Sequence, residues 1–253
     1  MNNFELEVTD DLQASFMARI TEFAGSHPGP SSLFVTGGSQ AHLCYPALAS
    51  ALSDSRSPLG RYEIFLGDER VVPLTSESSN TALIDGLIGS AYRASELRQI
   101  YSPTRTTEVD LAELMAASDP VPTHISDAQS AALRGLTNGF AQALRAAPAA
   151  RLVHLGLGPD GHVASNFPNG IDFGIRTPEA ATSLDVTGLN RFWRLTISMD
   201  FINSSSLVLL SVSGSEKGEV LRRVLTNPDS FPAGNINAPN FAIVVDRQAS
   251  LAL

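Results

Sequence analysis

Cysteine is nearly absent from this sequence of 253 residues, in which Cys44 is the one example. A single cysteine excludes a disulfide within the chain and is typical of proteins kept in a reducing compartment, so a cytoplasmic location is expected. No apolar run is long enough to cross a bilayer, and the first residues lack the basic and apolar regions of a signal peptide. We therefore expect no membrane partner.

Basic residues are also scarce, because 17 Lys and Arg stand against 26 Asp and Glu and leave a net charge of −9. A nucleic-acid partner would require a basic face, and none is therefore expected. A small anionic ligand stays possible, since a few local cations can hold a phosphate.

Several signatures of known chemistries are missing as well. No group of Cys, His and carboxylate residues has the spacing of metal ligands, so no metal is expected. The Gly-x-Ser-x-Gly turn that presents a nucleophilic serine is absent. The glycine fingerprints of phosphate loops and dinucleotide-binding folds are absent too. Neither a serine nucleophile of that kind nor a nucleotide-binding loop is predicted.

What the sequence does contain is a regular alternation of two patterns. Apolar runs typical of buried strands alternate with segments of helical periodicity along nearly the whole chain. We expect strands at residues 4–8, 33–35, 62–66, 152–155, 192–197, 207–212 and 241–245. This order predicts an α/β fold, a mostly parallel, Rossmann-like sheet with helices on both faces. The length allows one large domain or two small ones, and we expect a single domain over residues 1–253.

Two segments do not follow the alternation. Residues 171–190 are polar and irregular, and we expect them to cross the surface without regular structure. Residues 90–122 show no clear pattern of either kind.

Glycine-rich or charged turns follow four of the expected strands. They are residues 36–39, 67–70, 156–162 and 213–217. The carboxyl ends of parallel strands meet at one edge of a sheet, so these turns are expected to converge. Glycines that lead into a helix let backbone amides bind a phosphate, and Arg70 and Lys217 would supply cations. Taken alone, the turn at residues 156–162 is equally compatible with an ordinary solvated loop, Gly37-Gly38-Ser39 is common in plain turns, and residues 68–70 would usually form a solvated loop.

The turn after the strand at residues 152–155 carries a carboxylate and an imidazole, Asp160 and His162. Histidine titrates near neutral pH and suits the role of general base. The alternative is a solvated histidine in a turn rich in Gly and Pro. His154, in the middle of the preceding strand, is expected to be a core histidine instead.

Together, these stretches resemble the 6-phosphogluconolactonase family, within the glucosamine-6-phosphate isomerase/6-phosphogluconolactonase superfamily. The likeness extends from Thr36 to Asp246 and rests on residues 36–39, 67–73, 79–80, 156–168, 194–196, 214–217 and 231–233. It implies hydrolysis of 6-phosphoglucono-δ-lactone in the pentose phosphate pathway, with no obligatory cofactor and a phosphorylated sugar lactone as the partner. We expect a monomer or a small homo-oligomer.

The roles of His162 and Arg70 follow from the resemblance, and those of the other residues are what lactone hydrolysis at this site would need. The family's catalytic histidine falls on His162 and its arginine after the second strand falls on Arg70, while Asp160 would orient the imidazole. The substrate and its phosphate would be held by Gly37, Gly38, Ser39, Asp68, Gly158, Arg194 and Lys217. Which cation meets the phosphate and which meets the lactone stays open.

The chain departs from the family pattern in places. Gln40-Ala41 replaces the usual Thr-Pro, and Val163 and Asn166 replace Thr and Leu. Asn166 is similar to the related glucosamine-6-phosphate deaminases, which carry Asp-Glu-Tyr where this chain has residues 68–70. A sugar-phosphate isomerase or deaminase is therefore the second hypothesis, and a sensor that binds a sugar phosphate without turnover is the third.

Overall fold

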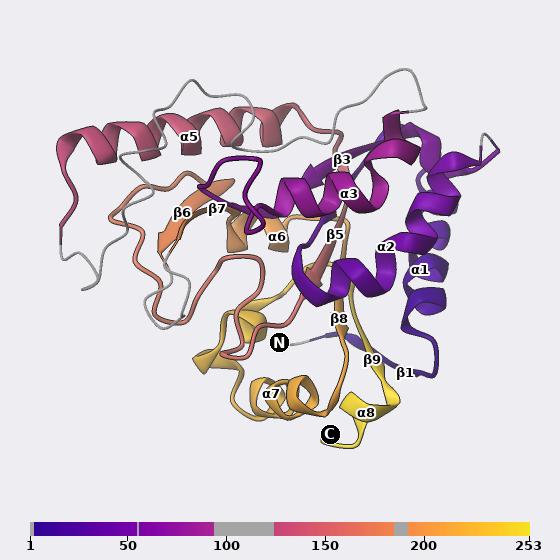
Figure 1. The fold of residues 1–253 in the computed structure, drawn as a ribbon. Helices are drawn as coiled ribbons and strands as arrows, with labels where there is room; N and C mark the ends of the chain where they lie inside the picture. Colours follow the sequence, from indigo (N-terminus) through magenta and orange to yellow (C-terminus); the bar gives the residue numbers. More distant parts are fainter. Residues whose placement is uncertain (1–2, 55, 94–123, 185–191) are drawn as a thin grey trace.

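A computed structural model describes residues 3–54, 56–93, 124–184 and 192–253 (Figure 1). Its centre is a six-stranded sheet with the strand order β1-β9-β8-β5-β2-β3, and every neighbouring pair is parallel. The strands are β1 (Glu5–Thr9), β2 (Ser31–Val35), β3 (Tyr62–Leu66), β5 (Ala150–Gly156), β8 (Leu207–Val212) and β9 (Phe241–Asp246). The predicted parallel sheet is confirmed.

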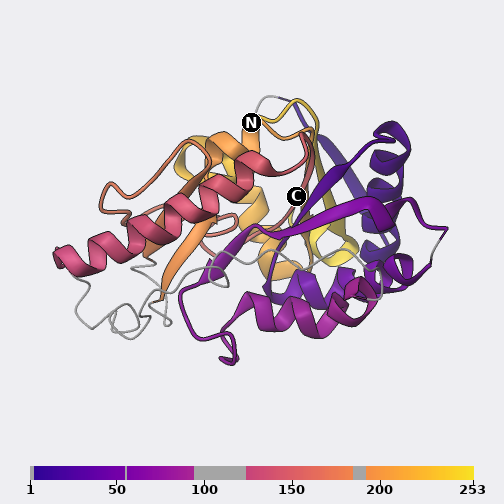
Figure 2. The ribbon, with the colours of Figure 1, turned by 90° about the horizontal axis from the view of Figure 1, so that it is seen from above.

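Helices cover both faces of this sheet, as the alternating sequence pattern predicts. They are α1 (Leu12–Ser26), α2 (Gly38–Ser53), α3 (Asn80–Arg93), α5 (Asp127–Ala146), α6 (Met199–Asn203), α7 (Ser215–Thr226) and α8 (Arg247–Ser250). One apolar core joins α1, α2 and α3 to the sheet, and a second joins α5 and α7 to its other face. Figures 1 and 2 show α5 and α1 on opposite sides of the central strands. None of the described helices is long and apolar enough to cross a membrane.

A second, smaller sheet corrects the sequence-based expectation. Strands β4 (Asp68–Arg70), β7 (Trp193–Ile197) and β6 (Ala180–Leu184) pair antiparallel in the order β4-β7-β6. Residues 68–70 are therefore not a solvated loop, and the segment 171–190 contains a strand. Both strands are short, three and five residues long. They form because β7 offers backbone partners on each side, which periodicity along the chain cannot show.

The register of the parallel sheet decides where the predicted turns lie. Phe34 of β2 stands beside both Phe65 of β3 and Val153 of β5, and Gly156 stands beside Ser211 of β8. The turns that follow these strands therefore leave from one edge of the sheet. Most of the segment 90–122 that showed no clear pattern lies outside the described residues.

Candidate active site

A cavity of about 210 Å³ lies at this edge, where the four turns meet the small sheet. All of the predicted site residues except Asp160 line it: Gly37, Gly38, Ser39, Asp68, Arg70, Gly158, His162, Arg194 and Lys217. The expected convergence of the turns is therefore confirmed as geometry. Their individual roles remain predictions.

Asp160 does not line the cavity itself, but it contacts His162, which does. The Nδ1 atom of His162 lies 2.5 Å from Oδ1 of Asp160, and the His162 amide donates to the same oxygen at 3.2 Å. Burial raises the pKa of the Asp160 carboxyl, but the hydrogen bonds and charge of His162 outweigh it and leave the pKa below its usual value. An ionised carboxylate can only accept, so Nδ1 carries the proton and Nε2 keeps a lone pair.

Glycines fix the position of the imidazole. A Cβ atom at residue 158 would lie 2.2 Å from Cε1 and Nδ1 of His162, so the ring packs directly against the Gly158 backbone. Gly161 has a φ of +80°, and a Cβ there would meet the Phe231 ring at 2.4 Å. The centroid of the Phe167 ring lies 4.7 Å from that of the imidazole. A larger residue at 158 would displace the imidazole, and one at 161 would displace the Phe231 ring, which explains two of the glycines in this turn.

Strand β4 places Asp68 and Arg70 in the wall of the cavity. Asp68 is buried, accepts a hydrogen bond of 2.5 Å from the Ser165 hydroxyl and lies 3.8 Å from Nη1 of Arg194. Arg194 stacks over the Phe167 ring at 5.3 Å from its centroid. Arg70 donates from Nη1 to the Ser78 carbonyl at 2.8 Å, which ties its guanidinium to the loop before α3.

Glu69, between Asp68 and Arg70, connects β4 to the start of α3. Its carboxylate accepts hydrogen bonds from the amides of Arg70, Asn80 and Thr81 at 2.7, 2.8 and 2.7 Å, and from the hydroxyls of Ser79 and Thr81. Burial raises the pKa of Glu69 while these donors oppose the shift. The carboxylate thus caps the start of α3, a favourable place for negative charge.

The turn after β2 has the features of an anion site. Helix α2 starts at Gly38 and its N-cap residue, Gly37, makes no capping hydrogen bond through a side chain. First-turn amides without such a cap are ready to bind an anion. A Cβ at Gly37 would lie 2.3 Å from Oδ1 of Asn80, so the glycine also admits that side chain.

Lys217 faces the same turn from the first helical turn of α7. Its Nζ donates to the Ser39 hydroxyl at 3.1 Å, which joins turns that are far apart in sequence. Burial lowers the pKa of Lys217, an effect that a bound anion would reverse. Lys217 is also the one lysine in the sequence.

Sequence reasoning missed some residues of the cavity wall. Asn80 lines it and donates from Nδ2 to the Asp68 carbonyl at 3.0 Å. Gln40 lines it as well and donates to the Ser213 hydroxyl at 2.9 Å. The sequence did mark both positions: Asn80 belongs to the Ser79-Asn80 motif shared with the family, and Gln40 departs from the family pattern. Thr36, Gly156, Leu157, Pro159 and Ala164 complete the lining.

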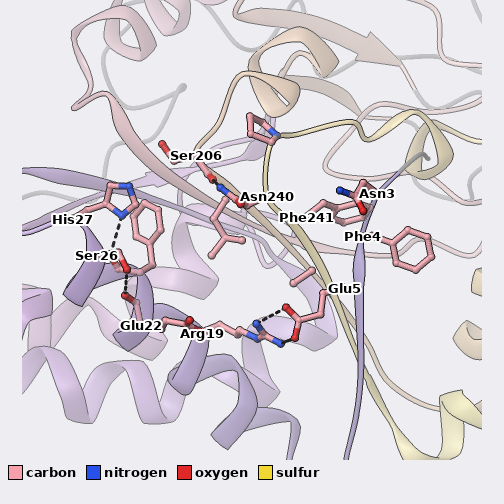
Figure 3. Close-up of a pocket in the computed structure, with 14 residues that line it drawn as sticks. Asn3, Phe4, Glu5, Arg19, Glu22, Ser26, His27, Ser206, Asn240 and Phe241 are labelled. Atoms are coloured by element: carbon pink, nitrogen blue, oxygen red, sulfur yellow. Dashed lines mark hydrogen bonds and ion pairs between the residues drawn. The ribbon is translucent and has the colours of Figure 1, made fainter.

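A larger cavity, of about 650 Å³, lies at the opposite edge of the sheet, where β1, β8 and β9 begin (Figure 3). Its arginine, Arg19, is paired with Glu5 and Glu7. His27 is within 3.0 Å of the Phe23 carbonyl through Nδ1 and stacks on the Phe23 ring. These groups satisfy one another, so the smaller cavity is the better candidate for an anionic ligand. The described residues contain no group of three or more potential metal ligands.

The arrangement is a cavity lined by three cations, a histidine and the start of a helix at the carboxyl edge of a parallel α/β sheet, and comparison with known proteins identifies the family. The model of the family Glucosamine-6-phosphate isomerases/6-phosphogluconolactonase matches residues 5–245, and the chain belongs to this family.

Individual relatives lie at moderate identity. A probable 6-phosphogluconolactonase of Schizosaccharomyces pombe is 26% identical over 247 residues, which cover 94% of this chain and 90% of the relative. A 6-phosphogluconolactonase of a Synechocystis species is 29% identical over 241 residues, which cover 91% and 88%. The crystal structure of 6-phosphogluconolactonase from Leishmania guyanensis has the same fold, with a TM-score of 0.73 at 20% identity over 98% of both chains.

Proposed function

We propose that this chain hydrolyses 6-phospho-D-glucono-1,5-lactone to 6-phosphogluconate, a step of the oxidative pentose phosphate pathway. The observation that carries the proposal is the Asp160–His162 pair at a cavity that also holds Arg70, Arg194 and Lys217. The relatives named 6-phosphogluconolactonase support it. We further propose that residues 1–253 act as one domain, and that the protein works in the cytoplasm, which its single, buried Cys44 supports.

In this proposal His162 is the general base. Its Nε2 takes a proton from water as the water oxygen attacks the lactone carbonyl carbon. The tetrahedral intermediate then collapses, the bond between that carbon and the ring oxygen breaks, and the imidazolium returns the proton to the ring oxygen. The new carboxylic acid loses its proton to solvent. Asp160 holds the ring and stabilises the imidazolium while it exists.

The cations and amides have two tasks in the proposed reaction. One set stabilises the negative charge that develops on the carbonyl oxygen, a contribution that is usually large. The other set holds the phosphate. Lys217 and the start of α2 support the phosphate task, because the Lys217–Ser39 contact brings a cation to uncapped helix amides. We assign Arg70 and Arg194, on the small sheet, to the lactone end.

The test is a comparison of substrates. Freshly prepared 6-phosphoglucono-δ-lactone should open faster with the purified protein than in its absence, whereas glucosamine 6-phosphate should not be consumed. Consumption of glucosamine 6-phosphate with only spontaneous lactone opening would favour the deaminase hypothesis. Binding of both compounds without turnover of either would favour the sensor.

A further inference from the structure

A chain of buried polar groups lies directly behind the turn that begins α2. The Thr36 amide donates to the Tyr45 hydroxyl at 2.7 Å. That hydroxyl lies 2.9 Å from Nδ1 of His154, and Nε2 of His154 lies 2.9 Å from the Ser211 hydroxyl. Tyr45, His154 and Ser211 are at most 1% exposed. A buried polar network of this kind rigidifies its surroundings only when every member is satisfied.

The first link fixes the direction of all the others. A backbone amide can only donate, so the Tyr45 oxygen accepts from Thr36; among the described residues Nδ1 of His154 is the acceptor in reach of the Tyr45 proton, which therefore points to it. Nδ1 is therefore the acceptor, and Nε2 carries the proton that His154 donates to Ser211. Burial lowers the pKa of His154 to about 3 and raises that of Tyr45. The groups are thus neutral, and every hydrogen bond runs in the same direction, from Thr36 through Tyr45 and His154 to Ser211.

The elements that this network joins are those that carry the site. Thr36 follows β2 and precedes Gly37, Tyr45 belongs to α2, His154 to β5 and Ser211 to β8. The turns after these three strands hold Gly37, His162 and Lys217. Phe16 of α1 packs on the His154 ring at 4.5 Å and on the Tyr45 ring at 5.8 Å between centroids, without a polar contact.

We propose that Tyr45 and His154 are positioning residues, which hold the Thr36–Gly37–Gly38 backbone in the geometry that binds the substrate's phosphate. The proposal rests on the proposed function for the identity of that substrate. Tyr45 acts through the Thr36 amide, since its hydroxyl fixes the residue before the anion-binding turn. His154 acts one step further away, because it sets the direction of the Tyr45 hydroxyl and anchors it to β5 and β8.

The variant Tyr45→Phe tests this, because it removes the hydroxyl and keeps the ring. We expect the KM for the phosphorylated lactone and the dissociation constant for inorganic phosphate to rise about tenfold, the effect of losing one hydrogen bond in a site. We expect kcat, and the reaction of unphosphorylated glucono-δ-lactone, to change less than about twofold. Calorimetric titration with phosphate needs no turnover, so it tests the positioning role even if the lactonase assignment fails.

Phe16→Leu is the matched control, since Phe16 touches the same two rings but makes no hydrogen bond to them. It should lower thermal stability and leave phosphate affinity unchanged. The proposal is overturned if Tyr45→Phe binds phosphate like the native chain, or if Phe16→Leu loses as much affinity. Should Tyr45→Phe fail to fold, Ser211→Ala decides: a two- to threefold weaker affinity is expected, and native affinity overturns the proposal.

Discussion

The Nδ1 atom of His162 donates to Oδ1 of Asp160 across 2.5 Å, and this contact determines which nitrogen of the imidazole is left to act as the proposed base. Nδ1 is committed to the carboxylate, so the lone pair lies on Nε2. The pair is two residues apart in one turn, and the close packing of Gly158 on the ring keeps the turn compact.

Asp160→Asn should lower kcat while the protein stays folded. An asparagine can present its NH₂ group to Nδ1, which favours the wrong tautomer of the imidazole. We expect kcat to fall by up to about 10⁴-fold, the loss that the same change causes in a Ser-His-Asp triad, with KM nearly unchanged. Asp54→Asn, at the far end of α2, is the control and should keep the native rate. An unchanged kcat in Asp160→Asn would show that the contact does not orient the base.

Gly158→Ala should impair catalysis through geometry alone. The added Cβ would lie 2.2 Å from the His162 ring, so the imidazole must move. A displacement near 1 Å costs about 10- to 100-fold in rate. The matched control is Gly135→Ala in α5, where a Cβ meets no atom within 4 Å and the change should stabilise the helix by about 0.5–1 kcal/mol. Steady-state kinetics and thermal unfolding of both variants test this, and equal rates would contradict it.

Lys217→Met should weaken binding of the phosphate group without affecting the reaction at the lactone group. Removing a charged donor from a phosphate raises KM for the phosphorylated lactone by about 10- to 100-fold, whereas unphosphorylated glucono-δ-lactone should react as before. Equal losses on both lactones would show that Lys217 has a structural role.

The sequence offers a second check on Lys217. Because it is the one lysine in the chain, acylation of side-chain amines reports on it alone. Inorganic phosphate should slow acylation of Lys217 if its amine lies at the phosphate site. Acylation at the same rate with and without phosphate would show that the amine lies elsewhere.

Stability should depend on pH through His154. Burial lowers the pKa of His154 from 6.5 to about 3. Between these values the unfolded chain binds a proton that the folded chain does not, so the free energy of unfolding falls as the pH falls. One proton gives a slope of about 1.4 kcal/mol per pH unit. Urea titrations between about pH 7 and about pH 4 measure how the free energy of unfolding depends on pH. The slope should be reduced in His154→Leu. It should be retained in the control His42→Gln, because His42 is exposed. Identical slopes would contradict the buried, neutral state.

The sequence predicted the parallel sheet and the converging turns because both depend on local signals. The turns at residues 36–39 and 156–162 contain glycines directly after apolar runs, and parallel strands bring such turns to one edge. The small sheet could not be predicted in this way. Glu69 is buried only because donors arrive from residues 79–81, and Asp68 because Ser165 and Arg194 reach it from far along the chain.

His154 shows the same limit at a single residue. Its place in a strand of apolar residues predicted a core histidine, and its burial confirms this. Its partners, Tyr45 and Ser211, lie 109 and 57 residues away and carry no shared local pattern. Only the packing of α2 against β5 and β8 brings them into contact.

The rate of lactone opening by His162→Gln tests the central claim most directly. The substitution removes the base and leaves the phosphate contacts in place, so the variant should fold, bind phosphate like the native chain, and open 6-phosphoglucono-δ-lactone about 10²–10⁴-fold more slowly. A folded His162→Gln protein that opens the lactone at the native rate would contradict the account.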